Sequence, residues 1–214
     1  MKVQEIKEKG TNLFNKLSRR LIQVEREHPY TLQHLERVRR YSLYLGRLCK
    51  LNPEEILLLD LASRLHDIGK VKMVDLIQEP RSLTQEEFEM VKQHPKFGYE
   101  IVAEYPLLKW VAEAVYSHHE RWDGKGYPRG LKGEKIYSLA QIVAITESFD
   151  AMLDRNRPYK NNRTLVDAIK EIKANAGTQF NKDLALLFIS DEDELRQITK
   201  KAFNLVSKKP YPQH

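Results

Sequence analysis

The sequence of 214 residues predicts an all-α fold. Apolar residues recur at spacings of three and four along most segments, as they do on one face of a helix, and strictly alternating apolar and polar runs are hard to find. Helix-start signals precede several of these segments. One long irregular stretch, residues 120–133, is rich in glycine and proline, and a loop of this kind in a helical domain is often functional.

In the N-terminal half, the first predicted helix is highly charged and has one apolar stripe that starts at Ile6 and Leu13. Asn52 is an N-cap followed by proline and two acidic residues, and Thr84 opens a capping box with Glu87. His94-Pro95 ends one helix and begins another. The predicted helices are 5–24, 31–50, a third ending at residue 66, 84–91 and one beginning near residue 95.

In the C-terminal half, the predicted helices are 107–118, 138–153, 163–175 and one long helix from Asn181 to the region of Leu205. No internal repeat, low-complexity tract or interdomain linker is visible. We predict three parts, which are an N-terminal helical extension (1–28), a catalytic domain (29–190) and a C-terminal helix and tail (191–214).

Composition excludes several classes of protein. The mean hydropathy is −0.59, no apolar run approaches the roughly 18 residues that cross a bilayer, and the first ten residues are charged, so we expect a cytoplasmic protein without a membrane span. Cys49 is the single cysteine, so any metal must be held by histidine and carboxylate ligands. The net charge of +6 would suit a polyanionic ligand, but the basic residues are spread along the chain beside 30 acidic ones and select no partner.

Histidines gather at predicted helix ends. His66-Asp67 ends the third helix, where Gly69 is expected to stop it and let both side chains reach one cluster. His118-His119 repeats this arrangement directly before the glycine-rich loop. Each pair alone is more typical of an ordinary surface or core position.

Two further histidines strengthen the pattern. His94 precedes a proline, which leaves its imidazole free to point across a helix N-terminus, and His34 lies on an inner face of the second helix. Five histidines and one aspartate in such positions indicate a metal site, and the carboxylate of Asp67 could bridge two cations.

The motifs resemble a known family. The run His66-Asp67-Ile68-Gly69-Lys70, the pair His94-Pro95 with Gly98, and the stretch from His118-His119-Glu120 to Gly126-Tyr127-Pro128 are similar to the HD-GYP subgroup of HD-domain phosphohydrolases. Arg157-Pro158-Tyr159-Lys160 and Gly177-Thr178-Gln179-Phe180 match two further signatures in the expected order, and the resemblance covers about residues 31–189.

The resemblance implies an HD-domain helical bundle that uses two or three divalent metal ions, with iron or manganese expected. It would hydrolyse cyclic di-GMP to pGpG and/or GMP by attack of a hydroxide held between two of the ions. Asp67 would bridge the ions and Lys70 would contact the scissile phosphate. Substrate would meet residues of the loop and of the later signature, which are Gly126, Tyr127, Arg157 and Lys160. The implied metal ligands are His34, His66, Asp67, His94, His118, His119 and Glu147.

Two positions depart from the family pattern. Glu147 stands where the family has a ligand aspartate, and its longer arm would need a changed rotamer. The alternatives are that Asp150, on the same helix face, is the ligand, or that neither carboxylate is. Tyr30 stands one turn before His34, where members with three metals carry glutamate, so we predict a binuclear site.

Three functions stay open. The leading hypothesis is an active cyclic-dinucleotide phosphodiesterase, without a DNA partner, regulated by a separate protein or as a homodimer. The second is a catalytically weak sensor of the same nucleotide that acts through a protein partner, with Glu147 as the lesion. The third is an HD phosphohydrolase acting on another nucleotide. The apolar stripe of the first helix is expected either to mediate self-association or to pack back onto the same domain.

Overall fold

A computed structural model describes residues 2–25, 30–77, 81, 83–154 and 163–206, and within them it contains helices and no β-strand. This confirms the all-α prediction. The α-helices are α1 Lys2–Glu25, α2 Tyr30–Leu48, α3 Pro53–Leu65, α4 Val74–Ile77, α5 Gln85–Val91, α6 His94–Ala103, α7 Lys109–Ser117, α8 Ser138–Leu153, α9 Leu165–Ala174, α10 Lys182–Phe188 and α11 Glu192–Val206. Three short 3-10 helices are η1 Ile68–Lys72, η2 Pro106–Leu108 and η3 Gly133–Lys135.

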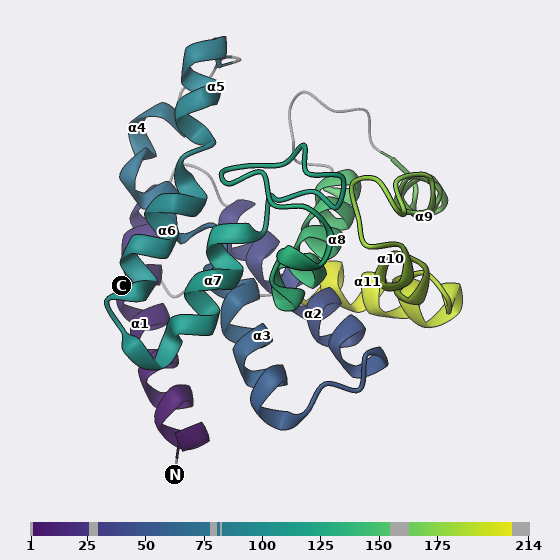
Figure 1. Cartoon of the computed structure of the whole chain (residues 1–214), viewed down its shortest axis with the longest axis horizontal. Helices are drawn as coiled ribbons and strands as arrows, with labels where there is room; N and C mark the ends of the chain where they lie inside the picture. Colours follow the sequence, from purple (N-terminus) through teal and green to yellow (C-terminus); the bar gives the residue numbers. More distant parts are fainter. Residues whose placement is uncertain (1, 26–29, 78–80, 82, 155–162, 207–214) are drawn as a thin grey trace.

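Helices α2, α3 and α8 form the centre of the bundle, between α1 on one side and α9 to α11 on the other (Figure 1). The apolar face of α2 is completely buried at Val38, Tyr41 and Leu45. The Tyr41 ring meets the Phe149 ring of α8 edge to face, with centroids 5.1 Å apart. The contact between α2 and α8 therefore anchors the core that carries the site.

The helix N-caps predicted from the sequence are present in the structure. The side chain of Asn52 accepts hydrogen bonds from the backbone N–H groups of Glu54 and Glu55, and Thr84 and Glu87 form the predicted capping box of α5. A further capping box at Thr164 opens α9. These caps satisfy backbone donors that a helix leaves without partners at its start.

Two local predictions were wrong. The single C-terminal helix predicted from residue 181 is two helices, α10 and α11, separated at Ile189–Asp191, because Asp191 starts a new helix by accepting a hydrogen bond from the backbone N–H of Glu194. Gly69 does not stop α3, which ends four residues earlier at Leu65. It lies within η1, where any side chain would clash with the backbone of His94 and Gly98.

Helix α1 packs against α3 of its own chain, with Ile6 and Leu13 among the buried core residues. These two residues of the apolar stripe therefore pack back onto the same domain, which is the second of the two expected outcomes. Side chains 17–25, which carry the rest of the predicted stripe, lie outside the described residues. Among the residues described, no helix has both the length and the apolar character to cross a membrane.

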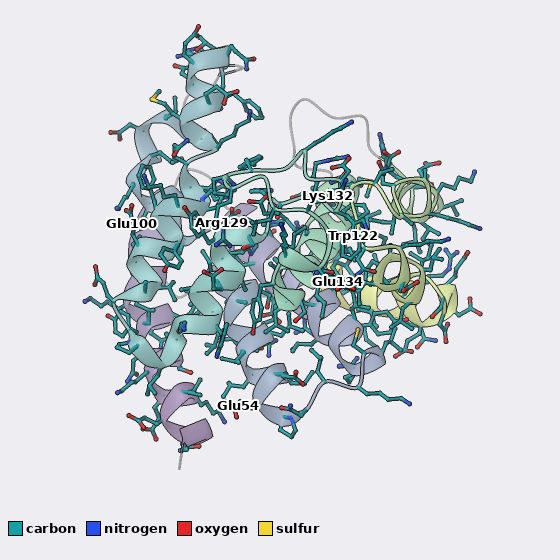
Figure 2. All side chains as sticks on the ribbon, viewed as in Figure 1. Glu54, Glu100, Trp122, Arg129, Lys132 and Glu134 are labelled. Carbon is teal, nitrogen blue, oxygen red and sulfur yellow. The ribbon has the colours of Figure 1, made fainter. Side chains whose placement is uncertain are left out.

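Residues 118–137 contain the irregular segment predicted from the glycine-rich sequence, followed by η3. Figure 2 labels four side chains of this stretch, which are Trp122, Arg129, Lys132 and Glu134. The loop is held in place by backbone hydrogen bonds from Trp122 N to Gln179 O (3.0 Å) and from Asp123 N to Thr178 O (2.8 Å). The two sequence signatures on either side of α8 are therefore joined directly.

Candidate metal centre

Three helix ends meet at one buried point. His66 and Asp67 follow α3, His94 begins α6, and His118 and His119 follow α7. The tight contact of Gly69 with the backbone of α6 brings the first of these ends against the second. The structure thus brings together the residues that the sequence marks as a metal site.

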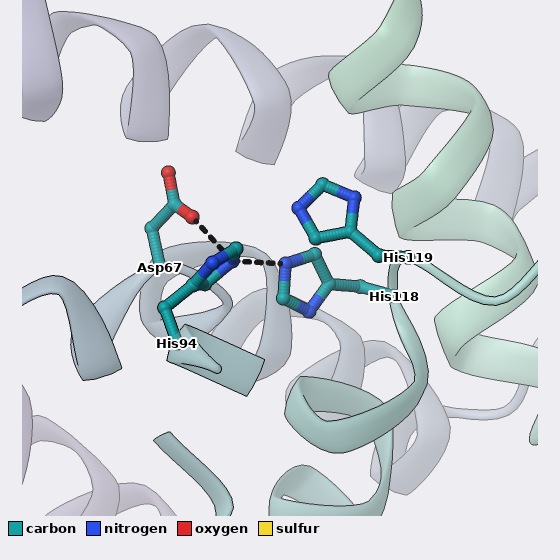
Figure 3. Close-up of side chains that lie close together, drawn as sticks. All are labelled: Asp67, His94, His118 and His119. Atoms are coloured by element: carbon teal, nitrogen blue, oxygen red, sulfur yellow. Dashed lines mark hydrogen bonds and ion pairs between the residues drawn. The ribbon is translucent and has the colours of Figure 1, made fainter. Parts of the chain in front are cut away.

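The ligand atoms form two close groups that share one carboxylate. Asp67 lies with His94, His118 and His119 in one group (Figure 3), and with His34 and His66 in the other. His94 Nε2 is 3.2 Å from Asp67 Oδ1, while His66 Nε2 is 3.6 Å from Asp67 Oδ2. Each oxygen of the carboxylate therefore faces one group.

The backbone fixes the orientation of three imidazoles in the same way. The Nδ1–H groups of His66, His94 and His118 donate to the carbonyl oxygen three residues earlier, at 2.9, 2.8 and 2.6 Å. Carbonyls in the last turn of a helix lack intrahelical partners, so they are free to accept these bonds. With the proton on Nδ1, each Nε2 keeps its lone pair and points into the cluster.

These atoms fit a metal ion. His34 Nε2, His66 Nε2 and Asp67 Oδ1 are buried and have no hydrogen-bond partner, which is costly for polar atoms unless a cation is bound there. His94 Nε2 and His118 Nε2 lie 3.1 Å apart, and with both Nδ1 protons directed to carbonyls no proton remains to join them. Imidazole and carboxylate ligands of this type suit divalent transition metals.

His34 is oriented by another helix. It lies inside α2, and its Nδ1 donates to Asp150 Oδ2 of α8 at 2.7 Å. Asp150 also accepts two bonds from Arg37, from Nε to Oδ1 at 2.6 Å and from Nη2 to Oδ2 at 2.9 Å. Both oxygens of Asp150 are therefore engaged away from the cluster, and the contacts of Asp150 favour support of His34 over the alternative of direct ligation.

Glu147 faces the cluster from α8 without joining either close group. Its Oε1 lies 3.9 Å from His119 Nε2. The other departure, Tyr30, begins α2, but its side chain lies outside the described residues. Arg157 and Lys160, the predicted substrate contacts of the later signature, also lie outside them.

Lys70 neutralises the shared carboxylate. Its Nζ lies 2.5 Å from Asp67 Oδ2, and 28% of the Lys70 side chain is exposed. Burial alone would raise the pKa of Asp67, but the charge of Lys70 holds it well below its usual range. The carboxylate is therefore ionised and ready to bind a cation.

Burial also sets the protonation of the histidines. It lowers the pKa of His66 below the usual 6.5, and it lowers those of His118 and His119 well below that value, with the neighbouring histidines adding to the effect. These three imidazoles are neutral at pH 7. Neutral imidazole is the form that binds a metal ion.

The glycine-rich loop folds back onto the cluster at Gly126. A side chain at this position would clash with backbone atoms of His119, Glu120 and Arg121, so only glycine permits the contact. The next residue, Tyr127, stacks its ring on that of His119, with centroids 4.8 Å apart. The loop thus covers the side of the cluster on which His119 lies.

The sequence model of the HD domain family matches residues 16–184 of this chain. The chain belongs to the HD domain family. The match includes every described residue of the cluster, and it confirms the family that the motifs indicate.

This HD domain is similar to curated phosphodiesterases. It is 38% identical over 174 residues to a cyclic di-GMP phosphodiesterase of Thermotoga maritima, covering 80% of this chain and 47% of that protein. It is 32% identical over 225 residues to the cyclic di-GMP phosphodiesterase response regulator RpfG of Xanthomonas campestris, covering 97% of this chain and 59% of that protein. The HD domain therefore spans about half the length of these relatives.

Solved HD-domain structures share the fold. A crystal structure of a cyclic GMP-AMP specific phosphodiesterase of V. cholerae has a TM-score of 0.63 at 18% identity, over 88% of this chain and 54% of that one. The HD domain of the phosphodiesterase PgpH of L. monocytogenes, in complex with cyclic di-AMP, has a TM-score of 0.57 at 17% identity, over 91% and 99%. At these identities the likeness concerns the fold.

Sequence reasoning missed several supports of the HD domain site. Glu120 is buried, and its carboxylate accepts hydrogen bonds from the backbone N–H groups of Arg129 and Leu131, at 2.7 and 3.0 Å, which holds the loop closed. Arg37 lies in the same helix as His34 and binds Asp150, which is 113 residues away. No local pattern gives such a pairing, although a basic residue on the apolar face of α2 is a signal that it needs a buried partner.

Proposed function

We propose that this HD domain is a metal-dependent phosphodiesterase that hydrolyses cyclic di-GMP to pGpG and/or GMP. The observation that carries the proposal is the pair of close ligand groups that share Asp67. One carboxylate with an oxygen toward each group suits two neighbouring cations. The relatives named cyclic di-GMP phosphodiesterases support the choice of substrate.

Two divalent cations, iron or manganese, suit the mixed imidazole and carboxylate ligands. The proposed ligands are the seven residues predicted from the sequence, with Glu147 completing the group around His119. When bound, the ions supply an activated water and neutralise charge on the phosphoryl oxygens. The catalytic unit is proposed to be residues 29–190.

Lys70 and Tyr127 are proposed to bind the phosphate and line the substrate pocket. The Lys70 side chain is partly exposed beside the cluster, so its ammonium group would meet an anionic phosphoryl oxygen, where charge develops during hydrolysis. Burial and the charges of Glu147 and Asp67 raise the pKa of Tyr127, so its phenol stays protonated and can donate a hydrogen bond. Gly126 keeps Tyr127 at its place beside His119.

A second candidate substrate is 3'3'-cGAMP. A 3'3'-cGAMP-specific phosphodiesterase of Vibrio cholerae is 34% identical over 174 residues, covering 80% of this chain and 33% of that protein. The metal centre would act on either compound in the same way, because both present a phosphodiester between two nucleosides.

The test is turnover by protein purified anaerobically and loaded with Fe²⁺ or Mn²⁺. Cyclic di-GMP, 3'3'-cGAMP and cyclic di-AMP are compared, and linear and mononucleotide products are separated. Hydrolysis of cyclic di-GMP at the highest kcat/KM supports the proposal. Binding of cyclic di-GMP without any product would favour a sensor. If cyclic di-GMP does not bind and other nucleotides are hydrolysed, the result would favour a different phosphohydrolase.

Glu147 is tested by two variants of the same loaded protein. If Glu147 is a ligand, Glu147→Ala loses metal and activity, while Glu147→Asp keeps activity equal or higher because the shorter carboxylate restores the family pattern. Metal content is measured beside turnover. Full metal content and full activity in Glu147→Ala would remove Glu147 from the ligand set.

A further inference from the structure

Helix α11 lies beyond the part of the chain that the HD domain model matches, which ends at residue 184. It packs against α2, with Leu195 and Ala202 completely buried and Phe203 half-buried against the core. Figure 1 shows α11, in yellow, at the end of the molecule opposite α1. The helix thus contacts the element that carries the ligand His34.

Phe203 covers a buried cation. The ring centroid of Phe203 lies 4.7 Å from the Cζ atom of Arg37, whose guanidinium group lies over the ring. Arg37 is only 2% exposed, so the ring shields a face of the guanidinium that water would otherwise reach. A desolvated cation over an aromatic ring is held more firmly than an exposed one.

The Nε and Nη2 atoms of Arg37 donate to two carboxylates of the α8 region. Besides its two bonds to Asp150, Nη2 donates to Asp154 Oδ2 at 2.8 Å. Burial alone would lower the pKa of Arg37, but the hydrogen bond and charge of Asp150 outweigh it and raise the pKa, so the fork is fully charged. Asp150 in turn accepts the Nδ1–H of His34.

A continuous path of contacts therefore runs from α11 to the metal centre, through Phe203, Arg37, Asp150 and His34. Each step depends on orientation, because a guanidinium fork fits a carboxylate in one plane and the carboxylate must keep one oxygen on the imidazole. If the ring is removed, water reaches Arg37 and the fork can leave that plane. Asp150 then holds His34 less firmly.

We propose that α11 is a positioning element of the metal centre and that Phe203 is a positioning residue for His34. The inference rests on the proposed metal centre but not on the substrate. It assigns a role in metal binding to a helix outside the family match, and it predicts that changes at α11 alter the group that contains His34 and His66 before they alter the other group.

The experiment measures Co²⁺ binding by the full chain, followed through the visible absorption of the bound ion and by competition with a chelator. Phe203→Leu removes the aromatic face and keeps an apolar side chain, and Phe203→Tyr restores the ring. The matched control is Leu195→Ala, which removes a completely buried side chain from the same helix without touching Arg37. Thermal unfolding of each metal-free variant is measured in parallel.

In Phe203→Leu, the more weakly bound Co²⁺ ion is expected to bind about fivefold less tightly, and its absorption spectrum is expected to change. Phe203→Tyr is expected to restore the affinity and the spectrum. Leu195→Ala is expected to lower the Tm by roughly 5–15 °C while it binds Co²⁺ as the parent chain does. Unchanged Co²⁺ binding in Phe203→Leu overturns the inference, as does a loss that follows the Tm in both variants. Co²⁺ binding is independent of cyclic dinucleotide hydrolysis, so failure of the proposed substrate leaves this result readable.

Discussion

Replacing Asp150 with asparagine should damage the metal centre from outside it. An amide has one acceptor oxygen, whereas Asp150 accepts from His34 Nδ1 and from two nitrogens of Arg37. The amide NH₂ must then face a donor, and buried Arg37 keeps Asp154 as its anionic partner. Removing one partner of a buried ion pair lowers the free energy of unfolding by about 3–5 kcal/mol. Because Asp154 still pairs with Arg37, we expect a loss at the lower end, about 3 kcal/mol.

For a chain of this size, a loss of that magnitude lowers the Tm by about 6–12 °C. Loss of the carboxylate that orients a ligand histidine should also weaken metal binding by about 10–100-fold. Differential scanning calorimetry of the metal-free protein and Mn²⁺ titration measure the two effects, with Asp183→Asn, an exposed change of equal charge on α10, as the control. A variant with the parent's Tm and Mn²⁺ affinity would refute the assignment of Asp150 as the support of His34.

Three further predictions concern the site itself. Lys70→Ala removes the cation that competes for Asp67, so metal binding should be equal or tighter while turnover falls by about 10²-fold; full turnover would make Lys70 a structural residue. Gly126→Ala should displace the loop from the cluster and lower turnover by about 10²-fold at unchanged metal content, as measured by steady-state kinetics and metal analysis. The Tm of the metal-free protein should fall as the pH drops from 7.5 to 5.5, because the unfolded chain binds protons near pH 6.5 while His118 and His119, with lowered pKa values, resist protonation. A Tm that stays level or rises over that pH range would mean that these histidines are protonated in the folded protein.

Much of the fold was predictable because its signals are local. Apolar spacing and caps such as Asn52 and Thr84 depend on a few neighbouring residues, and they placed most helices within a few residues of their observed bounds. The break between α10 and α11 was missed because the apolar spacing continues across it. An aspartate that caps a new helix was hidden among the other acidic residues of that segment.

The candidate ligands at helix ends could be predicted because they stand in recognisable motifs, and the structure brings them together with His34. Their supports could not be predicted. The pairing of Arg37 with Asp150 and the contact of Phe203 with Arg37 join distant parts of the chain, and they exist only after α2, α8 and α11 have packed. The role of Gly69 could not be predicted either. A glycine that permits close contact with α6 looks, in the sequence alone, like a glycine that ends a helix.

The hydrogen bonds from Nδ1 of His66, His94 and His118 to carbonyls three residues earlier have a consequence for the order in which the site is assembled during synthesis. Each of these imidazoles is oriented by a carbonyl only three residues earlier in the chain, so its orientation needs no residue of α8. His34, although made first, acquires its orientation only when α8 delivers Asp150. Asp67, His94, His118 and His119 are therefore all synthesised before α8, which adds Glu147 to their group and orients His34 in the other.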